Sequence, residues 1–272
     1  MRTLGCLPST KNLNMHWLYS LSGFVVGLVV GVTGVGGGSL MTPLLVLVFG
    51  VAPVTAVGTD LLFAALTKTG GAWAHASRGN VAWSIVGWLA AGSVPASAVT
   101  LLLLHLFVPD PDKLSAIVSV ALGFALILTA GALLFREKLH AWAARHAASG
   151  PRSTTRSAQR TVALGAVLGV LVTVSSVGAG ALGVTILFLL YPSLAVARIV
   201  GTDIAHAVPL TLVAGLGHAA AGAVDWQLLG ALLAGSLPGI WLGSALSQKI
   251  PERLLRGALA AMLILIGGKL AL

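Results

Sequence analysis

Apolar residues fill long runs along the chain, and short polar or glycine-rich breaks separate these runs. Several runs exceed the roughly 20 residues that a helix needs to cross a hydrocarbon core about 30 Å thick. The strict apolar/polar alternation of an outer-membrane barrel is absent. The pattern therefore predicts an all-α polytopic membrane protein.

One break falls in the middle of an apolar region. The segment VTGVGGGSLMTP at 32–43 holds four glycines within five positions, and SSVGAGAL at 175–182 has the same form. Irregular backbone at membrane depth is tolerated only where protein buries it or where it lines a water-filled cavity. We therefore expect two glycine-rich re-entrant or broken-helix hairpins, over 17–50 and 160–191.

The two glycine-rich breaks belong to an internal repeat. When the chain is shifted by 143 positions, VGTD at 57–60 falls on VGTD at 200–203, and GSVP at 92–95 falls on GSLP at 235–238. His75 likewise falls on His218. A duplicated, interrupted hydrophobic segment is the best pointer in a sequence to the binding site of a secondary transporter.

Each copy is expected to consist of one hairpin followed by three transmembrane helices. The N-terminal repeat (1–135) has spans at about 54–77, 81–107 and 113–135, and the C-terminal repeat (160–272) has spans at about 195–220, 225–248 and 252–270. The segment 136–159 between them is polar and basic, and we expect a linker with a short surface helix near 139–147.

The Lys and Arg residues set the expected orientation. The linker carries several of them and should be cytoplasmic, because basic loops stay inside. The turns at Asp110 and Asp225 then lie outside, and most basic residues lie inside, if the two copies have opposite orientations. We therefore predict inverted structural repeats. The formal charge of +9 is spread over short loops, so no nucleic-acid partner is expected.

The glycine-rich breaks are candidates for anion binding. Glycine lets a ligand approach the backbone closely, and the N-terminus of the following helix carries partial positive charge. The alternative is that these glycines only allow close helix packing. The candidate substrate-binding residues in the two breaks are Gly36, Gly37, Gly38, Ser39, Ser175, Ser176, Gly178 and Gly180.

Ionisable residues within predicted spans are the second group of candidates, because such residues are costly in a membrane. Lys68 has no counterpart in the second copy, where Thr211 stands, and we expect it to supply positive charge for an anion. The alternative is a structural pair with Asp60. Thr59 and Thr202 in the VGTD elements join the substrate-binding candidates. The residues expected to serve coupling or structure are Asp60, Asp203 and His206.

Several classes of chemistry find no support. The single cysteine, Cys6, excludes a disulfide framework and a cysteine metal site. No metal site and no cofactor are expected. G-x-x-x-x-G-K-[ST], H-E-x-x-H and G-x-S-x-G are all absent, so neither ATP hydrolysis nor those hydrolase mechanisms are indicated. Energy would come from the membrane potential or from a gradient of protons or another coupling ion.

Taken together, these motifs resemble those of the TauE/SafE family of sulfite/organosulfonate exporter-like membrane proteins. The resemblance rests on VGVTGVGGGSL, AVGTD, TKTGGAWAH and GNVAW in the first copy, and on SSVGAGALG, RIVGTD, VDW and GSLPG in the second. It implies duplicated halves and transport of sulfur-containing or other small organic anions across the bacterial inner membrane. The second break departs from the GxGGG pattern, since Ala179 stands between Gly178 and Gly180.

These observations favour a multi-pass secondary transporter that exports a small anion, such as a sulfite or sulfonate, and is not an enzyme. The expected partners are the anion, the lipid bilayer and a coupling ion, and a homodimer is compatible with the sequence. An anion channel or a non-transporting membrane scaffold is the alternative. An intramembrane aspartyl protease using Asp60 and Asp203 is less favoured, because the repeat alone explains the twin aspartates.

Overall fold

The structure is a computed structural model that describes residues 10–33, 38–146, 154–246 and 252–271. Every regular element in these ranges is a helix, which confirms the predicted all-α class. The helices are α1 (Thr10–Thr33), α2 (Gly38–Leu47), α3 (Pro53–Ser77), α4 (Trp83–Phe107), α5 (Pro111–His146), α6 (Thr154–Ser175), α7 (Ala181–Leu190), α8 (Val196–Ala220), α9 (Trp226–Leu246) and α10 (Glu252–Ala271).

The helices follow the predicted order in each half: a long helix, a break, a short helix and three long helices. The main difference lies in the linker. The surface helix expected near 139–147 is continuous with α5, which runs for 36 residues to His146, and α6 begins at Thr154 instead of 160. The segment REKLHAWAARH at 136–146 contains good helix formers and no glycine or proline, so nothing ends the helix at residue 135.

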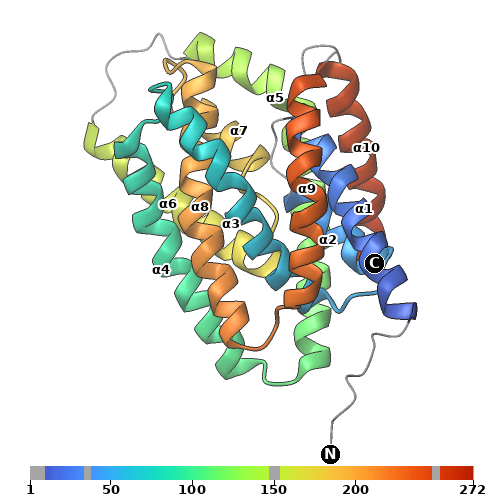
Figure 1. Ribbon diagram of the computed structural model, residues 1–272. Helices are drawn as coiled ribbons and strands as arrows, with labels where there is room; N and C mark the ends of the chain where they lie inside the picture. The colour runs from blue at the N-terminus through green and yellow to red at the C-terminus, as the bar shows by residue number, and fades with distance from the viewer. Residues whose placement is uncertain (1–9, 34–37, 147–153, 247–251, 272) are drawn as a thin grey trace, which may run out of the picture.

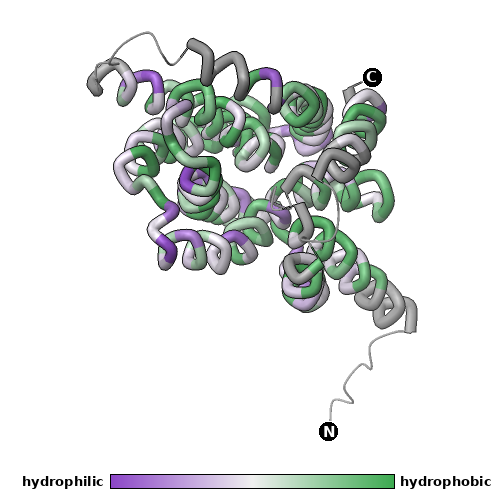
Figure 2. The backbone as a smooth tube through the Cα atoms, turned by 90° about the horizontal axis from the view of Figure 1, so that it is seen from above, coloured by the Kyte–Doolittle hydropathy of each residue, from purple (hydrophilic) through white to green (hydrophobic). Residues whose placement is uncertain are grey.

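Within the described ranges, five helices are long and apolar enough to cross a membrane: α4, α5, α6, α8 and α9. Helix α3 has similar length but is not among them, because it carries Asp60, Lys68 and several threonines. Apolar segments in α1 and α10 are shorter, at Leu18–Gly31 and Leu259–Leu270. Seen from above in Figure 2, hydrophobic colour covers most of the tube, and hydrophilic colour is confined to short stretches.

Helices of one half pack mainly against helices of the other. The principal pairs are α1 with α9, α4 with α6, α3 with α8, and α5 with α10. Figure 1 shows α1, α9 and α10 on the right of the bundle and α4, α6 and α8 on the left. The first helix of each half thus packs against the fourth helix of the other half. The third helices, α3 and α8, pack against each other, and so do the fifth helices, α5 and α10.

Glycines allow the exchanged pairs to approach closely. A Cβ added to Gly165 in α6 would lie 2.2 Å from the Leu89 oxygen of α4, and one added to Gly23 in α1 would lie 2.4 Å from the Leu232 oxygen of α9. Both glycines and both leucines are repeat equivalents. Small residues are the usual means by which membrane helices bring their backbones together, and the contact explains why the glycines occur in both copies.

Helices α3 and α8 cross in the middle of the bundle and run antiparallel. A Cβ on Gly58, early in α3, would touch Ala223 and His218 near the end of α8, and one on Gly201 would touch Asn80 and His75 in the same way. The two histidines therefore pack on the VGTD glycine of the opposite half.

Candidate functional site

The break between α6 and α7 places irregular backbone in the interior. Ser176 has a φ of 58°, Gly178 a φ of 118° and Gly180 a φ of 139°, conformations that favour glycine. Gly180 precedes α7 with no side-chain hydrogen bond at the cap. Backbone geometry therefore accounts for the glycines at 178 and 180. In the first break, Gly36, Gly37 and the side chain of Ser39 lie outside the described residues, and Gly38 begins α2.

Lys68 reaches from α3 to this second break. Its Nζ donates a hydrogen bond of 2.8 Å to the Ala179 oxygen, one residue before the glycine that precedes α7. The side chain is buried, and within the described ranges the ammonium makes this one hydrogen bond. The close pair with Asp60 is not formed, because in the described part of the chain only Lys113 and Asp110 lie within 4.0 Å as an ion pair.

Asp60 joins both halves of the molecule. Its Oδ2 accepts a hydrogen bond from the Thr42 hydroxyl of α2 and another, of 3.0 Å, from the Ser176 hydroxyl in the second break. The carboxylate is fully buried. A buried carboxylate needs such donors in place of water, so Thr42 and Ser176 fix Asp60 at the meeting point of α2, α3 and the break.

Asp203, the repeat equivalent of Asp60, has different surroundings. It is buried, yet neither carboxylate oxygen has a hydrogen-bond partner among the described residues. The sequence supplies the reason: in the repeat register of the breaks, Thr42 corresponds to Val184 and Ser176 to Gly34. Oδ1 lies against Gly183 in the first turn of α7, where an added Cβ would be 2.0 Å away.

Lys68 lies within electrostatic reach of both aspartates and of His206. The structure therefore brings together Asp60, Lys68, Ser176, Asp203 and His206, as a cluster around the second break. We call these residues the central cluster. Its carboxylates and ammonium come from α3 and α8, and the break supplies a hydroxyl and a carbonyl oxygen.

A row of buried polar groups leads away from the central cluster. His206 Nε2 lies 2.8 Å from the Ser93 hydroxyl of α4. One turn further along α4, Ser97 accepts a 2.7 Å hydrogen bond from the Thr173 hydroxyl of α6, and the Thr173 carbonyl oxygen lies 2.9 Å from His218 Nε2. These contacts form a polar seam between α4, α6 and α8.

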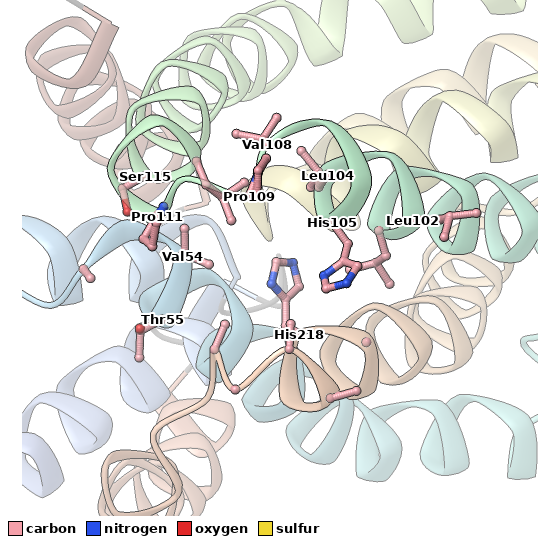
Figure 3. Close-up of a pocket in the computed structure, with 18 residues that line it drawn as sticks. Val54, Thr55, Leu102, Leu104, His105, Val108, Pro109, Pro111, Ser115 and His218 are labelled. Carbon is pink, nitrogen blue, oxygen red and sulfur yellow. The ribbon is translucent and has the colours of Figure 1, made fainter.

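His218 also lines a cavity of about 770 Å³ at the end of the molecule that contains the Asp110 and Asp225 turns. In Figure 3 the imidazoles of His218 and His105 lie near each other on its wall. Most other lining residues are apolar and come from the ends of α4 and α8 and the starts of α3 and α5. The cavity thus meets the polar seam at His218.

Some candidates from the sequence do not join the central cluster. The Thr59 hydroxyl accepts a 3.1 Å hydrogen bond from the Asp225 backbone, and the Thr202 hydroxyl accepts one of 2.9 Å from the Ala82 backbone. The two bonds are repeat equivalents. One ties α3 to the turn before α9, and the other ties α8 to the turn before α4. The Ser175 hydroxyl bonds to the Leu171 oxygen of its own helix. Their role in substrate binding stays a prediction.

Sequence reasoning missed Thr42, Ser93, Ser97 and Thr173. Each is a small hydroxyl residue in an apolar helix, and such residues often bond to their own helix instead. Ser93 belongs to the repeated GSVP element, which by itself marks only the equivalence of the two copies. Its partner His206 stands where the first half has Phe63, so the repeat itself gave no hint of the contact.

Comparison with known proteins decides the family. The family model described as "Sulfite exporter TauE/SafE" matches residues 19–270. The chain belongs to the sulfite exporter TauE/SafE family. This finding confirms the resemblance in the sequence and, with the candidate spans of the structure, identifies a multi-pass membrane protein.

Similar members of the TauE/SafE family are named as transporters. The chain is 37% identical to the "Probable membrane transporter protein YjnA" of Bacillus subtilis over 256 residues, covering 92% of this chain and 97% of that protein. It is 30% identical to the "Probable membrane transporter protein YdhB" of the same organism, covering 87% and 92%. A "Probable membrane transporter protein" of Xylella fastidiosa is 27% identical, with 84% of each chain covered. No solved structure matches the chain.

Proposed function

We propose that this TauE/SafE protein is a secondary transporter that exports a small anion, such as sulfite or an organosulfonate, across the bacterial inner membrane. The observation that carries the proposal is the hydrogen bond from the buried Lys68 ammonium to the Ala179 oxygen. It holds a positive charge beside the second glycine-rich break and the start of α7. The family name supports sulfite as the cargo class and export as the direction.

The physical argument concerns desolvation. An anion that enters the protein loses its water, and donors in the interior must replace those hydrogen bonds. The Lys68 ammonium has three N–H donors, of which one is used within the described residues. The N-terminus of α7, a helix of 10 residues, adds partial positive charge nearby. Together they favour an anion over a cation.

The arrangement of the halves supports transport by alternating access between inverted repeats. Antiparallel α3 and α8, the exchanged pairs α1–α9 and α4–α6, and the excess of basic residues on the expected cytoplasmic loops all agree with two copies of opposite orientation. We propose that the central cluster is the fixed site. The cavity beside His218 would then be its access from the outside.

Counterflow tests this function and separates a carrier from a channel. Purified protein in vesicles loaded with unlabelled sulfite, thiosulfate, ethanesulfonate or acetate is diluted into a trace of the labelled anion. A carrier accumulates label transiently for at least one of these anions, because internal anion drives the return step. Label that only equilibrates indicates a channel, and the absence of protein-dependent flux for every anion contradicts the proposal.

Lys68→Met is the first prediction for the site. Removing the ammonium should lower affinity for the transported anion at least about tenfold, the effect expected when a charged hydrogen bond worth about 1.5–3 kcal/mol is lost. Calorimetry on purified protein measures the affinity, and thermal unfolding monitors the fold. Lys113→Met is the matched control, since Lys113 is an exposed lysine paired with Asp110 at a turn. Normal anion binding by folded Lys68→Met would contradict a role for Lys68 in the site.

A further inference from the structure

We propose that Asp203 carries a proton that moves together with the anion, so that the transporter is an anion–proton cotransporter. The inference rests on the proposed function and assigns its coupling ion. It starts from the difference between the two aspartates of the repeat. Asp60 is held by two hydroxyl donors, whereas Asp203 has no hydrogen-bond partner in the described part of the chain.

The position of Asp203 makes its charge a competitor of the substrate. Its carboxylate lies against Gly183 in the first turn of α7, and Lys68 is within electrostatic reach. These are the two sources of positive potential that attract an anion. When Asp203 is ionised, its carboxylate interacts with both of them and weakens their attraction for the anion. When Asp203 is protonated, Lys68 and the α7 N-terminus are free to bind the anion.

The charged surroundings favour a proton over a metal cation such as Na⁺. A metal cation needs several oxygen ligands, and the positive charge of Lys68 on α3, within electrostatic reach of Asp203, opposes a second cation here. His206 stands three residues from Asp203 on α8 itself. Helix α7 contributes no titratable group. The remaining titratable groups on helices packed against α8 are Asp60 and His75 on α3, His105 near the end of α4, and Arg156 and Arg160 near the start of α6.

The transport cycle then balances in charge. On the loading side, a proton from water bonds to an oxygen of Asp203 as the anion binds at Lys68. On the release side, the anion leaves, the O–H bond breaks, and the proton passes to water. Lys68 and the ionised Asp203 neutralise each other on the empty return step. Transport of a monovalent anion is therefore electroneutral, and its direction follows the combined gradients of anion and proton.

The experiment uses ethanesulfonate, because a sulfonate keeps its charge across the working pH range. Wild-type protein is reconstituted in vesicles that contain a pH-sensitive dye, with the membrane potential clamped by K⁺ and valinomycin and without Na⁺. An outward ethanesulfonate gradient should drive proton efflux at a ratio near one, and affinity should fall about tenfold for each pH unit once Asp203 is ionised. Any counterflow that Asp203→Asn retains should lack the proton flux and the pH dependence of affinity.

Asp60→Asn is the matched control, since it changes the equivalent carboxylate; any ethanesulfonate flux that it retains should still carry protons. The outcomes separate the two proposals. If wild-type protein shows no counterflow with any anion, the proposed function fails. If wild-type counterflow occurs without proton flux, or if flux requires Na⁺, the assignment of Asp203 is overturned while the transporter stands. If Asp203→Asn does not fold, the ratio of protons to ethanesulfonate carried by the wild-type protein still tests proton coupling.

Discussion

At the scale of single residues, a hydroxyl group decides how an aspartate behaves inside this protein. Thr42 donates to Asp60, and at the equivalent place in the second half Val184 has a methyl group instead. The two side chains have almost the same shape, so packing does not change. The interior therefore gives Asp60 a donor that Asp203 lacks among the described residues.

Thr42→Val tests this point and copies the second half into the first. The substitution leaves volume unchanged but removes a donor from a buried carboxylate, which should cost about 1–3 kcal/mol of stability. Chemical unfolding in detergent, followed by tryptophan fluorescence, measures the loss. Thr185→Val is the control, because the Thr185 hydroxyl bonds only to the Ala181 oxygen of its own helix within the described residues. Equal losses in both variants would mean that the Thr42 hydroxyl does not stabilise Asp60.

At the scale of helices, glycines decide which pairs form. Gly92 in α4 faces α6, where an added Cβ would lie 2.0 Å from the Val162 oxygen, and its equivalent Gly235 in α9 faces α1, with 1.8 Å to the Ser20 oxygen. A methyl group at either position must push two helix backbones apart. Gly87 in α4 and Gly230 in α9 instead have open space around an added Cβ, so position matters more than glycine content.

Two substitutions on α4 separate these cases. Gly92→Ala should destabilise the protein by several kcal/mol, as for overpacking of a close contact. In size-exclusion chromatography, the peak of the folded protein should become broader. Gly87→Ala, at a glycine with nothing within 4 Å of an added Cβ, should behave like the parent. A stable, monodisperse Gly92→Ala protein would show that the α4–α6 contact tolerates separation.

How far the sequence predicts the structure also depends on the element. The helix order and the second break were predictable, because apolar runs, glycine clusters and the repeat all mark them along the chain. The contacts of Lys68 and Asp60 with the second break were not, since these residues lie more than 100 positions from their partners and no local pattern encodes which helices meet. The extent of α5 was missed because a polar, basic composition was taken as a sign of a linker.

At the scale of the whole molecule, the proposed opposite orientation of the halves predicts which turns face outside. Single cysteines at Asp110 and Asp225, in a protein whose Cys6 is replaced, should react with a membrane-impermeant maleimide in intact cells. A cysteine at Arg78, in the turn between α3 and α4, should react only after the membrane is opened. Labelling of Arg78→Cys in intact cells, together with protection of Asp110→Cys, would reverse the orientation.

The exchange of α1 and α4 between the halves has a consequence for how the chain is made. Helix α1 leaves the ribosome first, but its partner α9 is among the last elements to be synthesised, and α4 likewise waits for α6. Neither half can complete its own packing, so the two are interlocked and not merely adjacent. Expressed as separate polypeptides, each half should be degraded when alone and should survive when the other is made in the same cell.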